Sequence, residues 1–175
     1  MEKDYRDEIA KGRRGVIDWL MKFIPGYRGY AEKETRREAD KMLRQALANK
    51  LKGGQRRVEE TRDRFAAAAQ IDRLDDIDRV GLIFENVIDR LGFASYGYAG
   101  FFDTVRVDEE ALDRLYAYDE GLAQAIDVIN GKADALAQAA AAGEDITAKL
   151  DELKSELKAF ERKLDDRQNA ILGVA

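Results

Sequence analysis

Residues 146–171 read ITAKLDELKSELKAFERKLDDRQNAI and contain neither proline nor glycine. Apolar residues recur in this stretch at alternating spacings of four and three, which is the heptad pattern of a helix that packs against another helix. Arg167 is the one polar residue that interrupts the pattern. The stretch therefore predicts a long helix with a single apolar seam, formed by Ile146, Leu150, Leu153, Leu157, Phe160, Leu164 and Ile171.

The segment that precedes this seam repeats the same spacing. Asp108 is a predicted N-cap, and Asp119 occupies the one polar place in the apolar series that follows it. The series keeps its phase across Asn130-Gly131, which favours one continuous helix, and Gly143 is a predicted C-terminal cap. Because a short loop between two such helices forces them to run antiparallel, we predict a long C-terminal helical hairpin over residues 108–172.

Three further helices are predicted in the first half of the chain. Apolar residues at helical spacing occur in residues 16–24, 31–51 and 55–91. Pro25-Gly26 separates the first two of these segments, since the residue before proline disfavours the helical conformation. Gly53-Gly54 is the clearest turn signal in this half and predicts a break between the second and third helices.

Composition supports the same fold class. Charged residues make up 37% of the 175 residues, hydrophobic residues 45%, and there is a single proline. Such a composition is typical of long solvated helices and contains too little turn punctuation for a sheet protein. We predict an all-α protein, an elongated helical bundle in one domain. Its parts are an N-terminal amphipathic helix and turn (1–30), a helical pair (31–91), an aromatic and glycine-rich joint (92–107) and the coiled-coil-like antiparallel hairpin (108–172).

The joint begins with GFASYGYAGFFD, residues 92–103, in which glycines alternate with aromatic residues. This alternation makes a poor helix and a poor long strand. We interpret the passage as a structural joint whose rings close the end of the bundle. A ligand platform formed by Tyr96, Tyr98, Phe101 and Phe102 is the alternative interpretation.

Several classes of chemistry lack the residues that they need. The chain has no cysteine and no histidine, which removes thiolate zinc sites, the commonest general base and the commonest metal ligand. Ser95 and Ser155 are not in nucleophile-elbow contexts, and no phosphate-binding loop is present. The carboxylates of Asp72, Asp75 and Asp76 are interpreted as a solvated helix face. We therefore predict no catalytic residue, no cofactor and no metal site.

Charge is distributed unevenly along the chain. Residues 1–64 have a net charge of +6 and residues 65–175 a net charge of −11. The asymmetry indicates either halves that pack against each other or an anionic partner for the basic part. Basic residues in the first part alternate with acidic ones, and no nucleic-acid docking motif is visible, so nucleic acid is not predicted as the partner.

A basic and aromatic amphipathic segment lies near the start of the chain. Residues 13–26 read RRGVIDWLMKFIPG, and interfacial membrane helices combine such basic and aromatic residues. Asp18 and the wide apolar stripe favour burial against the protein instead. No apolar run reaches the roughly 20 residues of a membrane span, and no secretory signal pattern is present, so we expect a cytoplasmic protein.

Two segments carry a family resemblance. FIPGYRGYAEKETRREADKMLR (residues 23–44) and YGYAGFFDTVRVDEEALDRLYAYD (residues 96–119) resemble segments shared by a family of uncharacterised bacterial helical proteins. The resemblance implies a bacterial, cytoplasmic setting. It implies no activity, and no catalytic residue follows from it.

The expected function is a non-catalytic helical interaction or scaffolding module, with a protein partner or self-association. The alternative is a peripheral membrane protein, at the inner face of the membrane, anchored by residues 13–24. An enzyme or a nucleic-acid binder is a distant third alternative. The sequence does not show whether a small molecule binds. The candidate interaction surface comprises Arg13, Arg14, Trp19, Phe23, Tyr96, Tyr98, Phe101 and Phe102.

Overall fold

A computed structural model of the chain describes residues 33–93 and 109–172. Within these ranges the structure contains four long α-helices and one 3-10 turn, and no strand. The prediction of an all-α protein is confirmed for this part of the chain. The elements are α2 (Lys33–Ala67), η2 (Ile71–Arg73), α3 (Leu74–Phe93), α6 (Glu109–Ala142) and α7 (Thr147–Leu172).

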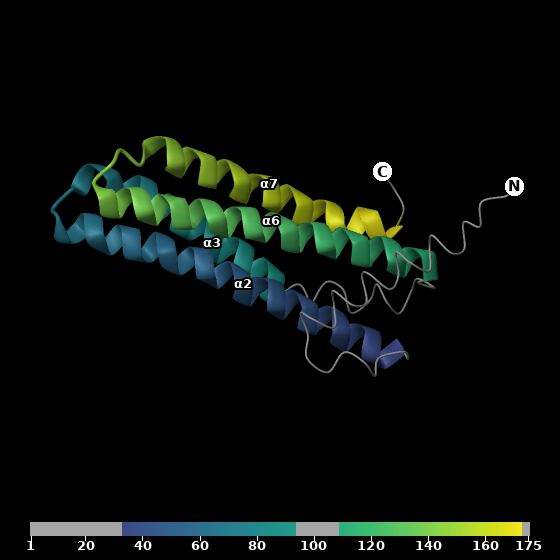
Figure 1. The fold of residues 1–175 in the computed structure, drawn as a ribbon. Coiled ribbons are helices and arrows are strands. Elements are labelled where there is room, and N and C mark those ends of the chain that lie inside the picture. The colour runs from purple at the N-terminus through teal and green to yellow at the C-terminus, as the bar shows by residue number, and fades with distance from the viewer. Residues whose placement is uncertain (1–32, 94–108, 173–175) are drawn as a thin grey trace, which may run out of the picture.

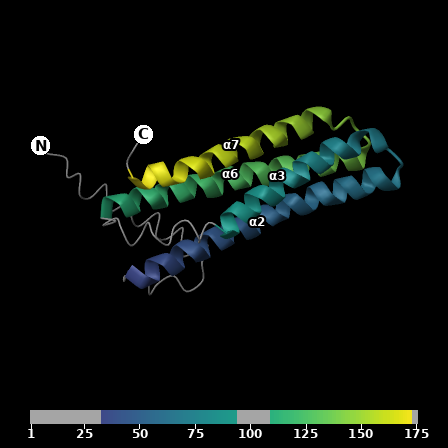
Figure 2. The same ribbon diagram turned by 180° about the vertical axis from the view of Figure 1, so that it is seen from behind.

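The four helices lie side by side (Figures 1 and 2). Helix α2 packs against α3 and α6, and α7 packs against α6 and α3, so that each helix has two principal neighbours. The turns between α2 and α3 and between α6 and α7 are at the same end of the arrangement (Figure 1). Helices α2 and α6 therefore run parallel to each other, and α3 and α7 return beside them.

The core fills the space between the four helices. Each helix contributes aliphatic or phenylalanine side chains at the three-and-four spacing that places them on one face. Five residues of the C-terminal seam are buried, and Leu164 is partly buried against the core. The largest fully buried side chains are Leu47, Leu51, Ile77, Phe84, Leu122, Ile126, Ile129, Leu136, Ile146, Leu153 and Phe160.

The predicted break at Gly53-Gly54 is wrong, because α2 continues through both residues to Ala67. Gly54 is buried where three helices meet. A Cβ at Gly54 would lie 2.5 Å from Asn130 Oδ1 of α6 and 3.0 Å from the Phe84 ring of α3. Glycine at this position permits close approach of the three helices. The i→i−4 hydrogen bonds of α2 hold its backbone in the helical conformation.

Helix α2 ends instead at a turn that contains no glycine. The Gln70 N–H donates to the Phe65 carbonyl at 3.0 Å and the Ala69 N–H donates to the Ala66 carbonyl at 3.1 Å. This pair of bonds is a Schellman motif, which needs a left-handed residue at its turn. Ala69 takes that conformation with φ 55°, although its Cβ makes the conformation costly. Without a glycine or proline, the sequence showed no signal for this turn.

Helix α6 ends with the same motif, and here the sequence signal was present. The Glu144 N–H donates to the Ala139 carbonyl at 3.0 Å, and Gly143 is left-handed with φ 73°. Gly143 therefore caps α6 as predicted. Helix α6 is also continuous across Asn130-Gly131, as its apolar phase indicated.

Helix α7 starts directly after this turn. Asp145 Oδ1 accepts hydrogen bonds from the Thr147 N–H at 3.0 Å and from the Thr147 hydroxyl at 2.6 Å. These bonds, the hydroxyl first, hold the pKa of Asp145 below its ordinary value. The start of α7 is therefore stabilised by an ionised carboxylate.

Candidate functional site

The residues of the predicted interaction surface lie outside the part of the chain that the structure describes. Arg13, Arg14, Trp19 and Phe23 precede α2, and Tyr96, Tyr98, Phe101 and Phe102 fall between α3 and α6. The membrane-anchor alternative for residues 13–24 and the aromatic joint therefore stay predictions. The joint's first two positions, 92 and 93, belong to the end of α3, which continues two residues past the predicted boundary.

The two polar interruptions of the apolar seams face each other. Arg167 of α7 donates from Nε to Asp119 Oδ1 at 2.7 Å and from Nη2 to Asp119 Oδ2 at 2.8 Å. The two side chains are 4% and 1% exposed. A buried, bidentate pair of this kind is costly to break and ties the register of one helix to the other. We assign these residues to the α6–α7 contact and not to a reaction.

A second buried cation lies at the same end of the helices. Arg44 of α2 donates from Nη1 to the Leu91 carbonyl at 3.2 Å, in the last turn of α3. Carbonyl groups at the end of a helix lack partners within the helix and carry partial negative charge. Arg44 therefore satisfies one of them and links α2 to the end of α3.

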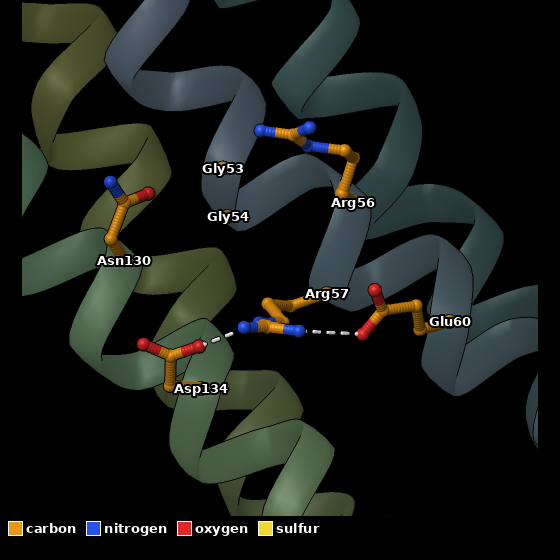
Figure 3. A pocket seen from close by; sticks show the side chains of 7 residues that line it. All are labelled: Gly53, Gly54, Arg56, Arg57, Glu60, Asn130 and Asp134. Atoms are coloured by element: carbon orange, nitrogen blue, oxygen red, sulfur yellow. Dashed lines mark hydrogen bonds and ion pairs between the residues drawn. The ribbon is translucent and has the colours of Figure 1, made fainter.

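A polar cleft of about 410 Å³ lies between α2 and α6 (Figure 3). The Arg57 guanidinium crosses it and donates to Asp134 Oδ1 at 2.8 Å and to Glu60 Oε2 at 2.9 Å. These two carboxylates, Glu60 first, raise the pKa of Arg57 above its ordinary value. The cleft is lined by Gly53, Gly54, Arg56, Arg57, Glu60, Asn130 and Asp134.

Asn130 forms the inner wall of this cleft. Its Nδ2 donates to the Lys50 carbonyl at 2.9 Å, which holds the amide against the backbone of α2. Its Oδ1 is buried beside Gly54 and has no hydrogen-bond donor among the described residues. The lining offers one amide, two arginines and two carboxylates, and no hydroxyl or thiol nucleophile. The residues that line the cleft therefore serve to hold α2 against α6.

A second depression, of about 490 Å³, lies at the turn end of the molecule. It is bordered by the η2 turn and by the turn before α7, and Ile71 on its rim is 71% exposed. Arg73 Nη2 and Asp145 Oδ1 lie 3.8 Å apart across it. Asp72, Asp75 and Asp76 are nearby in the chain. The described residues contain no group of three or more metal-ligating side chains that could hold an ion.

The outer face of α6 differs from the outer faces of the other helices. Eight of its exposed or half-buried positions between residues 117 and 142 form an uncharged stripe over more than six turns, which is flanked by Glu120, Asp127, Lys132 and Asp134. The largest apolar side chain among them is that of Val128, which is 49% exposed. The positions follow the three-and-four spacing of a helix contact. We call them the α6 outer stripe: Ala117, Gly121, Gln124, Val128, Gly131, Ala135, Gln138 and Ala142.

The corresponding faces of the other three helices are charged, as is normal for solvated helices. Exposed residues on them include Lys52, Arg56 and Glu59 of α2, Asp75, Arg79 and Asp89 of α3, and Asp151, Lys158 and Arg162 of α7. The α6 outer stripe was not predicted from the sequence. Its signal was present as a second uncharged repeat beside the apolar one, but alanine, glycine and glutamine do not register as an apolar pattern.

None of the helices within the described ranges is long and apolar enough to cross a membrane. Comparison with protein-family models, with curated proteins and with solved structures gave no match. The resemblance to a bacterial family stays a prediction. The function of this chain is therefore inferred from its own surfaces.

Proposed function

We propose that this chain is a non-catalytic helical interaction or scaffolding module, which includes association with itself. In this proposal the α6–α7 pair is a coiled-coil-like hairpin, and the chain is an elongated helical bundle whose aromatic joint connects its two halves. The observation that carries the proposal is the α6 outer stripe. It supplies a long helix face on which a partner can dock without stripping water from charged groups.

The charged residues that flank the stripe support this role. On the α2 side, Asp127 Oδ1 lies 2.6 Å from Lys50 Nζ and Asp134 Oδ1 lies 2.8 Å from Arg57 Nε. On the α7 side, Lys132 Nζ lies 2.9 Å from Glu152 Oε2. Three of the flanking charges therefore point toward a neighbouring helix and away from the stripe, and Glu120 is the fourth charge that borders it.

The composition of the chain makes this face unusual. Charged residues are 37% of the sequence, and they occupy most of the exposed positions on the other helices. Isolated exposed apolar residues such as Leu82 need no explanation, because single ones are common on protein surfaces. An uncharged stripe that continues from residue 117 to residue 142 is a different feature and favours contact with another helix.

To test the proposal, the size of the assembly is compared between the wild-type chain and two charged variants in fresh extract of the cells that produce the protein. We expect the wild-type chain to migrate as an assembly larger than its 19.8 kDa monomer. Val128→Glu places a charge at the centre of the stripe and should reduce the assembly to monomer, since docking would bury that charge without a partner. Leu82→Glu is the matched control, because Leu82 is 63% exposed on the charged face of α3.

Native electrophoresis and sedimentation of the extract measure the size of the assembly. Migration of the wild-type chain as a monomer would contradict the proposal. Equal behaviour of Val128→Glu and Leu82→Glu would exclude the α6 outer stripe as the contact surface.

A further inference from the structure

We propose that the polar cleft between α2 and α6, besides holding the two helices together, binds a small polar zwitterion, the class to which free α-amino acids belong. This site goes beyond the proposed function, since it uses neither the α6 outer stripe nor a partner chain. Three features of the cleft carry the inference: hydrogen-bonding groups that the fold leaves unused, a lining of zero net charge, and a glycine that helix packing does not require.

The cleft has the size and position of a small-molecule site. Its volume of about 410 Å³ falls within the roughly 300–1,000 Å³ of ligand pockets, which in helical bundles lie between helices. None of its seven lining residues has an apolar side chain (Figure 3). A ligand that fits this lining is therefore polar, and charged hydrogen bonds supply its affinity.

Arg56 is a cation of the cleft that has no carboxylate partner among the described residues. Its Nε donates to the Lys52 carbonyl at 3.3 Å, which turns the side chain back along α2 toward Gly53 (Figure 3). Its two terminal nitrogens make no hydrogen bond within the described part of the chain. A guanidinium pairs with a carboxylate through two parallel N–H bonds. Arg56 is therefore the partner for a ligand carboxylate.

Glu60 and Asp134 are the partners for a ligand ammonium. Each bonds to Arg57 through one oxygen, which leaves Glu60 Oε1 and Asp134 Oδ2 unused. Their side chains are 59% and 52% exposed, so a ligand can reach them. Asn130 Nδ2 gives one of its two N–H bonds to the Lys50 carbonyl and can donate the other, whereas its Oδ1 is buried and takes no part.

The balance of charge selects a zwitterion. The lining contains two arginines and two carboxylates, which sum to zero. Beside it, Lys50 and Asp127 form an ion pair of their own, and Lys52 and Glu59 carry opposite charges outside the lining. An anion or a cation would leave the cleft with an excess of one sign. A zwitterion leaves it neutral and places each of its charges beside the opposite one.

Gly53 keeps the cleft open at a cost to the fold. Glycine inside a helix is less stable than alanine, and at Gly54 this cost is explained by the close packing of Asn130 and Phe84. At Gly53 a Cβ would make only an ordinary contact, 3.9 Å from Asn130 Nδ2. Packing therefore does not require glycine there. Its absent side chain lets a ligand approach the helix backbone and leaves the Asn130 amide uncovered.

The experiment measures binding of free α-amino acids to the full purified chain. Each common α-amino acid is added separately in thermal denaturation, and those that raise Tm are titrated by calorimetry to obtain Kd. We expect at least one to raise Tm by about 5–10 °C at a concentration about a hundredfold above its Kd. The corresponding amine and the corresponding carboxylic acid, which each lack one charge, should bind at least about tenfold more weakly.

Three variants locate the site. Arg56→Gln removes the partner of the ligand carboxylate and should raise Kd at least about tenfold. Arg64→Gln is the matched control, since Arg64 is an exposed arginine of α2 outside the cleft, and it should leave Kd unchanged. Gly53→Ala should raise Kd at least about tenfold while raising Tm in the absence of ligand. A purely structural role of Gly53 would not produce these opposite changes.

Three results would overturn the inference: no α-amino acid that raises Tm or gives a heat of binding, equal Kd values for Arg56→Gln and Arg64→Gln, or an amine or acid that binds as tightly as the amino acid. None of these results depends on the size of the native assembly or on its response to Val128→Glu. The inference and the proposed function can therefore fail separately.

Discussion

Adjacent glycines in α2 should respond with opposite sign to the same substitution. Both Gly53 and Gly54 lie in the interior of a continuous helix, where replacement by alanine ordinarily stabilises a protein by about 0.5–1 kcal/mol. A Cβ at Gly53 would lie 3.9 Å from Asn130 Nδ2, which is an ordinary contact. Gly53→Ala should therefore raise the free energy of unfolding by about 0.5–1 kcal/mol.

Gly54→Ala gains the same helix propensity and meets two obstacles. Its Cβ would lie 2.5 Å from Asn130 Oδ1 and 3.0 Å from the ring of Phe84, which is fully buried. Overpacking a core costs about 1–3 kcal/mol. Displacement of Asn130 also breaks its bond to the Lys50 carbonyl, which contributes about 0.5–1.5 kcal/mol. After the propensity gain is subtracted, we expect a net loss of about 1–3 kcal/mol.

Urea and thermal denaturation, both followed by circular dichroism, measure the stability of the two variants. For a chain of this length, about 1 kcal/mol corresponds to about 2–4 °C in Tm, so the two variants should differ by several degrees. Gly54→Ala should cost less in an Asn130→Ala background, since the nearest obstructing atom is then absent. Equal stabilisation by Gly53→Ala and Gly54→Ala would refute the close packing of α2, α3 and α6 at Gly54.

Three further outcomes follow from the described contacts. Ala69→Gly should stabilise the protein by about 1 kcal/mol by relieving the left-handed alanine, and Gly143→Ala at the equivalent turn should destabilise it by a similar amount, both measured by thermal denaturation. Asp119→Leu should lower the free energy of unfolding by about 3–5 kcal/mol, measured by urea denaturation, because it leaves Arg167 buried without its carboxylate. The double variant Asp119→Leu with Arg167→Met should recover most of that loss, and a double variant as unstable as Asp119→Leu would argue against the pair. The lowered pKa of Asp145 means that its contribution to folding stability is complete above its unfolded pKa of 3.8 and is lost as the pH falls below that value. Asp145→Asn should therefore make stability less dependent on pH in the acid range and leave its pH dependence in the basic range unchanged.

Sequence periodicity predicted the helices wherever the buried residues recur at spacings of three and four along the chain. The seams before and after Gly143 identified α6 and α7, and their two polar interruptions became the Asp119–Arg167 pair. The prediction failed at Gly53-Gly54 and at Ala69. Glycine is selected both by turns and by close helix contacts, and local sequence does not distinguish these causes. Ala69 adopts a turn conformation that its residue type disfavours, so its position carried no signal.

The candidate site was predictable only in part. The aromatic and basic residues that were predicted as the interaction surface lie within residues 13–23 and 96–102, outside the described ranges. The α6 outer stripe consists of residue types with weak signals. Its meaning depends on two facts of tertiary structure: α2 and α7 leave that face of α6 uncovered, and they pair with its flanking charges.

The sequence by itself determined which segments are helical and which face of each helix is apolar, because a period of 3.6 residues converts residue order directly into a buried stripe. Only the tertiary structure decided the neighbours: α2 beside α6, α3 beside α7, Asn130 against Gly54, and Asp119 opposite Arg167. The physical reason is that helix formation uses contacts within about four residues. Helix pairing uses contacts between residues up to 80 positions apart, whose steric and charge complementarity exists only once the helices are packed.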